Sequence, residues 1–157
     1  MNELRKPVSE SYVNVSQIVF PTDANSVGTV FGGRILHWMD MAASLCARRH
    51  SRQRVATVAV NQVKFVKPVH VGDVVNIKAA VNRVFKVSME VGVKIFIENT
   101  NSGKIMHACS GYFYMVSLDV NDRPVRTFEV IAQTDEEKRR WENAGNRYEL
   151  NKKNKNF

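Results

Sequence analysis

FPTDANSVGTVFGGRILHWMDMAASLCARRH, from Phe20 to His50, is the stretch of sequence that decides the fold. A turn-rich segment leads into the pair Gly32-Gly33, and the mostly apolar residues that follow predict a helix of about five turns. Asp40 is the one carboxylate in this helix. Burying a carboxylate on an apolar helix is costly unless it is paired, protonated or used in chemistry. Asp40 is therefore the first candidate functional residue.

The chain on both sides of this helix carries strand signals. We expect five strands, at residues 12–20, 55–65, 74–85, 87–99 and 104–118, the last four meeting by hairpins. The alternation between Val87 and Ile97 is the clearest period-two pattern. This order favours an α+β fold in which a five-stranded antiparallel sheet wraps around one central helix. We expect the long strands 87–99 and 104–118 to leave an edge that pairs with a second copy of the chain.

The last part of the sequence predicts an accessory helix. Thr134 is a suitable N-cap, and three acidic residues follow it in the first turn. Trp141 and Tyr148, seven residues apart, share one side of this helix, which we expect to end near Leu150. We expect the lysine-rich residues after it to be disordered. The chain is thus divided into a main domain, 1–133, and a C-terminal helix with a basic tail, 134–157.

Composition narrows the class of protein. The 157 residues are 44% hydrophobic, which suits one folded domain. No apolar run is long enough to span a membrane and no signal peptide is recognisable, so we expect a cytoplasmic protein without a membrane partner. Cys46 and Cys109 match no metal or redox spacing, and the four histidines show no paired ligand spacing. We expect no metal site and no bound cofactor.

The net charge of +8 indicates an anionic partner or a solubilising surface. No zinc-finger spacing, aromatic-rich RNA-binding pattern or basic heptad helix is present, so nucleic acid is not expected. A small phosphate-bearing ligand stays open.

Three features near the central helix form a sensible hydrolytic site. Asn25 can orient water or a carbonyl, the backbone N–H groups of Gly32 and Gly33 can face an oxyanion, and Asp40 can act as a base. Each has a simpler alternative: Asp40 could bond His37, Asn25 could form an Asx turn, and the glycines could only let the chain enter the helix. Ser110 lacks the G-x-S-x-G context of a nucleophile.

Three blocks in this order resemble the hotdog-fold acyl-CoA thioesterases, in the branch of the brain-type cytosolic acyl-CoA hydrolase and its bacterial single-domain relatives. The first block is Pro21-x-Asp23-x-Asn25-x-x-Gly28-x-x-Phe31-Gly32-Gly33-x-x-Leu36-x-x-Met39-Asp40-x-Ala42-Ala43. The second is Ala56-Thr57 through Phe65-x-x-Pro68-Val69-x-x-Gly72-Asp73. The third is Lys86-Val87-Ser88-Met89-Glu90-Val91.

The resemblance implies double-hotdog dimers, often a trimer of dimers, with active sites at the dimer interface. It implies that Asn25 faces Asp40 of the partner chain and that the Gly33 N–H polarises the thioester carbonyl. Asp40 would activate water or attack directly. Gly32, Thr57 and Ser88 would contact the substrate. Coenzyme A, as part of that substrate, would place its phosphates near four basic residues: Arg48, Arg49, Lys64 and Lys67.

Two rival functions stay open beside hydrolysis of fatty acyl-CoA. One is a hotdog dehydratase acting on acyl thioesters, for which His37 is the candidate residue near the site. The other is a non-catalytic regulator that binds acyl-CoA or a nucleotide and does not need Asp40.

Overall fold

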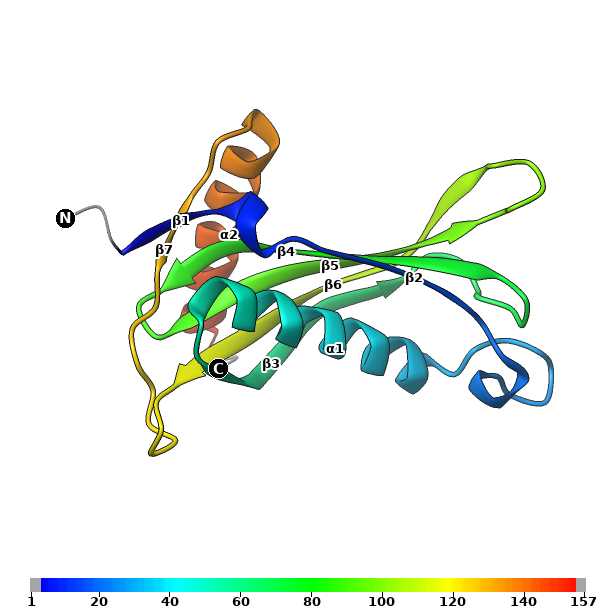
Figure 1. The fold of residues 1–157 in the computed structure, drawn as a ribbon, viewed down its shortest axis with the longest axis horizontal. Coiled ribbons are helices and arrows are strands. Elements are labelled where there is room, and N and C mark those ends of the chain that lie inside the picture. Colours follow the sequence, from blue (N-terminus) through cyan, green and yellow to red (C-terminus); the bar gives the residue numbers. More distant parts are fainter. Residues whose placement is uncertain (1–3, 155–157) are drawn as a thin grey trace.

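The computed structural model describes residues 4–154 of the chain. A five-stranded antiparallel sheet curves around one long helix, α1 (Gly32–Ser51), as Figure 1 shows. The strands lie in the order β2 (Val13–Ile18), β4 (Val74–Phe85), β5 (Ser88–Glu98), β6 (Ile105–Leu118) and β3 (Arg54–Phe65). This is the hotdog arrangement, and the expected α+β fold is confirmed.

The core lies between α1 and the face of the sheet that we call the inner face. The alternating residues Met89, Val91, Val93 and Ile95 of β5 are at most 1% exposed and point into this core. On the helix, Met39 is fully buried and its sulfur lies 3.6 Å from the Cys109 thiol of β6. Period two on the strands and period 3.6 on the helix thus meet in one hydrophobic layer.

The expected edge strands are wrong. β5 and β6 lie inside the sheet, and the edges are β2 and β3. β3 and β4 do not form a hairpin: β3 pairs with β6, whereas β4 pairs with β2 and β5. Consecutive strands are neighbours in only about two-thirds of cases, and the segment between Phe65 and Val74 here carries the chain to the other side of the sheet.

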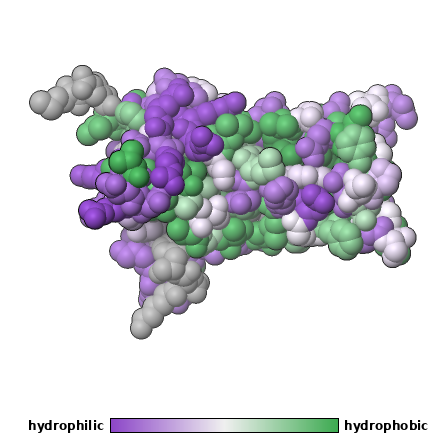
Figure 2. Space-filling view, turned by 60° about the horizontal axis from the view of Figure 1, so that its bottom comes forward, coloured by the Kyte–Doolittle hydropathy of each residue, from purple (hydrophilic) through white to green (hydrophobic). Residues whose placement is uncertain are grey.

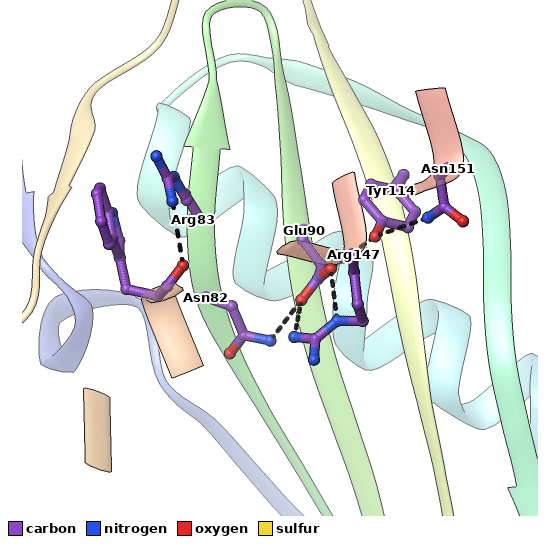
Figure 3. Close-up of polar contacts among 7 residues, drawn as sticks. Asn82, Arg83, Glu90, Tyr114, Arg147 and Asn151 are labelled. Carbon is purple, nitrogen blue, oxygen red and sulfur yellow. Dashed lines mark hydrogen bonds and ion pairs between the residues drawn. The ribbon is translucent and has the colours of Figure 1, made fainter. Parts of the chain in front are cut away.

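The opposite, outer face of the sheet receives α2 (Asp135–Lys153). Figure 3 shows its main anchor, in which Arg147 donates to both carboxylate oxygens of Glu90 at 3.1 and 2.7 Å. Glu90 is completely buried and also accepts from Asn82 at 2.9 Å and from the Tyr114 hydroxyl at 2.6 Å. Both oxygens of this buried carboxylate therefore accept hydrogen bonds, as a buried charge requires.

The ends of α2 were predicted unequally well. Thr134 is the N-cap and forms a capping box with Glu137, as expected from the sequence. The helix extends past Leu150 through Lys153, so the prediction of a disordered tail is wrong for Lys152 and Lys153. Lys155, the third lysine of that predicted tail, lies outside the described residues. Side-chain contacts with the sheet explain the extra turn: Tyr148 stacks on Phe85 at 3.9 Å, and Asn151 donates to the Tyr114 hydroxyl at 3.4 Å.

A second, two-stranded sheet was not predicted. β1 (Arg5–Pro7) pairs in parallel with β7 (Glu129–Ile131). Two short 3₁₀ helices, η1 (Val8–Ser11) and η2 (Pro21–Asp23), complete the elements. Within β1, Lys6 donates to the carbonyl oxygen of His50 at 2.7 Å, so an ammonium group closes the C-terminal end of α1. Within residues 4–154, no helix is long and apolar enough to cross a membrane.

Candidate active site

Asp40 and Thr57 form a hydrogen-bonded pair between the helix and the edge strand β3. The Thr57 hydroxyl donates to Oδ1 of Asp40 at 2.6 Å. Asp40 is half-buried and Thr57 is exposed, so the pair is open to solvent in one chain. Among the residues that the structure describes, no donor reaches Oδ2 of Asp40. One carboxylate oxygen is thus held and the other is available.

The backbone of β3 places Thr57 in this position. Its register with β6 shifts between Thr57 and Ala59, so Val58 is the extra residue of a β-bulge. Bulges are common beside active sites because they turn a side chain out of the regular alternation. The Thr57 hydroxyl also lies 3.4 Å from the sulfur of Met115 on β6, directly across from it. His37, considered above as an alternative partner for Asp40, is exposed and makes no such bond.

Asn25 organises the loop that precedes the helix. Its Oδ1 accepts from the backbone N–H groups of Val27 at 3.0 Å and Thr29 at 3.1 Å, and its Nδ2 donates to the Thr29 hydroxyl at 2.7 Å. The loop turns at Gly28, whose φ of +83° suits glycine. The Asx-turn interpretation of Asn25 is therefore correct for the single chain, and one N–H of its amide is left for another acceptor.

The glycine pair forms the N-terminus of α1. The N-cap residue Phe31 supplies no side-chain hydrogen bond, and its carbonyl accepts from Arg34 and Ile35. Gly32 and Gly33 lie in the first turn of α1, where backbone N–H groups have no partner within the helix. Gly33 is exposed, and a Cβ built on it would meet nothing within 4 Å, so no side chain crowds this residue.

An apolar groove of about 340 Å³ begins at this helix terminus. Its walls are Val30 and Ile35 on one side and the β3 end with Phe65 and Val66 on the other. Lys67 lies at its margin. The mostly apolar lining can take an alkyl group, and Lys67 is the one cation in it.

The four basic residues expected to bind phosphates are not gathered in one place. Arg48 and Arg49 lie 16 and 17 residues beyond Gly32 on α1, which places them about 24 Å away along the helix axis. Arg49 donates to the backbone carbonyl of Tyr12 at 2.8 Å. Lys67 is therefore the expected cation that the structure places beside the helix N-terminus.

Lys64 and Ser88 face away from Asp40. Lys64 aligns with Ser110 on β6, which points to the outer face, while Ser88 shares the outer face with Glu90. The Ser88 hydroxyl donates to the Phe85 carbonyl at 3.5 Å and closes the turn between β4 and β5. The serine in the third block therefore has a local structural contact rather than one with the Asp40 site.

Comparison with known proteins places the chain in a family. Residues 27–104 match the model of the thioesterase superfamily, a range that includes Asp40 and Thr57. The uncharacterized acyl-CoA thioester hydrolase YkhA of Bacillus subtilis is 37% identical over 128 residues, which are 82% of this chain and 74% of that protein. The chain belongs to the thioesterase superfamily. The expected hotdog thioesterase family is confirmed.

Two solved structures extend the similarity to the whole chain. A hexameric acyl-CoA thioesterase in its apo form superposes with a TM-score of 0.92 at 33% identity and covers 96% of each chain. The acyl-CoA hydrolase of Staphylococcus aureus, solved with butyryl coenzyme A and coenzyme A, superposes with a TM-score of 0.92 at 32% identity, over 96% of this chain and 92% of that one. Variants of the latter enzyme carry alanine in place of an asparagine, an aspartate and a threonine.

Proposed function

We propose that this thioesterase hydrolyses fatty acyl-CoA to a fatty acid and coenzyme A, with Asp40 as the general base. The observation that carries the proposal is the Asp40–Thr57 pair: a carboxylate with Oδ1 fixed at 2.6 Å and Oδ2 available, at an open position on the helix. A base used in catalysis must be both oriented and accessible, and this one is both.

The reaction can be written with water, the substrate and the groups of Asp40 and Gly33. Oδ2 of Asp40 takes a proton from a water molecule, whose oxygen attacks the thioester carbonyl carbon. The negative charge that develops on the carbonyl oxygen is stabilised by the N–H of Gly33 at the helix terminus. The C–S bond then breaks, the acid is released, and the proton held by Asp40 returns to the thiolate of coenzyme A.

The distances along the helix support an active site built from two chains. Gly33 and Asp40 are seven residues apart on α1, about 10 Å along its axis. A base and an oxyanion donor must both lie within about 3 Å of atoms at one carbonyl. We therefore assign Gly33 and Asn25 of one chain, and Asp40 and Thr57 of the other, to each active site.

The free edge of β3 supports the dimer that this assignment requires. Within residues 4–154, the edge of β3 away from β6 has no strand partner, and several large apolar side chains around it and on α1 are exposed. They include Met41, Leu45, Val58, Val60 and Phe65. Figure 2 shows hydrophobic side chains over much of the α1 and β3 side of the molecule, with the hydrophilic ones gathered at one end. An edge and an apolar surface of this kind favour pairing with a second copy.

The Staphylococcus aureus enzyme gives separate support for the three side chains. The intervals between its substituted asparagine, aspartate and threonine are 15 and 17 residues. Asn25, Asp40 and Thr57 have the same residue types at the same intervals. This agreement favours one shared site. The name of the apo-hexameric relative favours a larger assembly of such dimers.

Thiol release from palmitoyl-CoA and acetyl-CoA tests the activity, and mixed subunits test the shared site. We expect release from both substrates or from one, and a preference for palmitoyl-CoA would fit the apolar groove. Asn25→Ala and Asp40→Asn proteins, each weakly active, should regain activity when their subunits are exchanged, since each mixed dimer contains one site with both residues intact and one with both replaced. No recovery after verified exchange would refute the two-chain site.

The rival functions have distinct outcomes in the same experiments. Hydration or dehydration of an acyl thioester without thiol release would identify a dehydratase. Binding of acyl-CoA without turnover would identify a regulator. Single-turnover hydrolysis in isotopically labelled water separates the two roles of Asp40: label in the fatty acid alone fits a general base, whereas label in Asp40 requires a covalent intermediate. The cytoplasmic location and the absence of a cofactor stay predictions.

A further inference from the structure

Thr29 is bonded to Asn25 through both its backbone and its side chain. The Asn25 Nδ2 group donates to the Thr29 hydroxyl at 2.7 Å, and the Thr29 backbone N–H donates to Asn25 Oδ1 at 3.1 Å. The backbone N–H of Asn25 also donates to the Thr29 carbonyl at 2.8 Å. Three hydrogen bonds therefore join the two residues, and one of them depends on the Thr29 side chain.

These contacts limit what the Asn25 side chain can offer a substrate. Its Oδ1 already accepts from two backbone N–H groups, those of Val27 and Thr29. An amide oxygen has two lone pairs, so Oδ1 has no acceptor position left for water. The amide nitrogen has two N–H groups, and the Thr29 hydroxyl accepts from one of them. Among the described residues the other N–H has no acceptor, and because the amide is planar, the bond to Thr29 sets its direction.

Thr29 is itself fixed by the segment that connects β3 with β4. It forms an isolated β-bridge with His70, and the N–H of the next residue, Val30, donates to the Val69 carbonyl at 2.8 Å. Figure 1 shows the loop that carries Thr29 at the N-terminal end of α1. Thr29 also lines the apolar groove that begins at this helix terminus. Its hydroxyl therefore lies on an anchored backbone beside the groove and can hold the Asn25 amide in one orientation.

We propose that Thr29 is a positioning residue for hydrolysis, which directs the free N–H of Asn25 toward the thioester carbonyl. The inference rests on the proposed function, in which Asn25 belongs to the active site. A hydrogen-bond donor stabilises the transition state best when it is already aimed at the oxygen on which negative charge develops. Without the Thr29 hydroxyl, one N–H of the amide loses its acceptor and the amide can turn. Thr29 thus acts through Asn25 and needs no contact with the substrate.

Steady-state thiol release by Thr29→Val tests the inference. Valine removes the hydroxyl with little change of shape, and we expect kcat to fall about tenfold with the KM for acyl-CoA nearly unchanged. Thr29→Ser retains the hydroxyl and should recover most of the rate. Thr22→Val is the matched control, because it makes the same change at an exposed position in η2, in the same loop. The Thr22 hydroxyl makes no hydrogen bond within residues 4–154, and we expect this variant to keep the wild-type kcat.

The Asn25→Ala background separates positioning of the amide from a general effect on the loop. Once the amide is absent, Thr29→Val should lower kcat no further. A further fall of about tenfold in the double variant would overturn the inference. So would an unchanged kcat in Thr29→Val, or an equal fall in Thr29→Ser or in Thr22→Val. Failure of the proposed function is distinct from these results, since the wild-type protein would then release no thiol, and the inference would fail with it.

Discussion

The hydroxyl of Thr57 lies 2.6 Å from Oδ1 of Asp40, so a residue of the edge strand fixes the carboxylate of the central helix. Thr57 pairs directly with Met115 of β6 on the inner face, immediately before the β-bulge at Val58. Among the described residues, no strand pairs with the other edge of β3. The position of the base is therefore linked to the edge through which we propose that two chains pair.

Replacing Asp40 with asparagine should nearly abolish turnover. The change retains the shape but removes the basic oxygen, so we expect kcat to fall by about 10²–10⁴. Circular dichroism and thermal unfolding should match the wild type. His37→Asn is the matched control on the same exposed stretch of α1, and we expect it to retain activity. A loss with His37→Asn instead would favour the dehydratase.

Thr57 should act through the orientation of Asp40. Thr57→Val removes the hydroxyl with little change of shape, and we expect kcat to fall by about 10- to 100-fold, the size of a lost hydrogen bond to a charged group. Thr57→Ser retains the donor and should restore most of the rate. Steady-state kinetics separates this from a binding role, since an increase in KM alone, with kcat unchanged in Thr57→Val, would contradict it.

Arg147 should hold α2 on the sheet. Arg147→Met leaves the fully buried carboxylate of Glu90 without its cation, and we expect a loss of about 3–5 kcal/mol in the free energy of unfolding. Urea denaturation measures this loss. The double variant Glu90→Gln/Arg147→Met should be more stable than Arg147→Met, because no buried charge is then left unpaired. An additive loss in the double variant would contradict that explanation.

His50 should make stability depend on pH below neutrality. Its ring is fully buried, and burial lowers the pKa of His50 below 6.5 despite its hydrogen bond to the Phe128 carbonyl. At pH values above 6.5, His50 is neutral in both the folded and the unfolded chain. Below it the unfolded chain binds a proton that the folded chain resists, so stability decreases as pH falls.

Thermal unfolding between about pH 7.5 and pH 5 measures this effect of His50. His50→Gln retains a donor toward Phe128 but cannot titrate, so its melting temperature should fall less steeply over the same range. Equal slopes for the two proteins would assign the acid sensitivity to other groups.

The two cysteines should not interfere with a thiol-release assay. Burial raises the pKa of Cys46 to about 12 and that of Cys109 to about 11, so neither forms a thiolate near neutral pH. We expect the native protein to react with a thiol reagent far more slowly than the released coenzyme A, and the unfolded protein to react at once. Rapid labelling of the native protein would show that the core opens.

Much of the fold could be predicted because its signals are local. The apolar run from Ile35 to Ala47 predicts a buried helix, and the alternation from Met89 to Ile97 predicts a half-buried strand. Strand order could not be predicted, since which strands pair depends on contacts between distant residues. The three-residue strands β1 and β7 are too short to show a period in the sequence.

The candidate site was only partly predictable for the same reason. Asp40 is conspicuous as the one acid in an apolar helix, whereas its bond with Thr57 depends on the packing of α1 against β3, which no local pattern marks. Lys64 was grouped with the site by its position near the second strand and Ser88 by the family resemblance, whereas alternation along their strands turns both to the other face within one chain. The face of the sheet to which a side chain points, set by the strand register, thus matters for the site as much as the residue type does.

The pairing of β1 with β7 sets an order on folding. Arg5 aligns with Glu129, so β1 can pair only with a strand, β7, that comes much later in the sequence. A polypeptide leaves the ribosome from its N-terminus, and β1 therefore has no partner until the chain has been synthesised through Ile131. The hydrogen bond from Lys6 of β1 to the carbonyl of His50 therefore forms late. We expect the C-terminal end of α1 to become rigid in one of the last steps of folding.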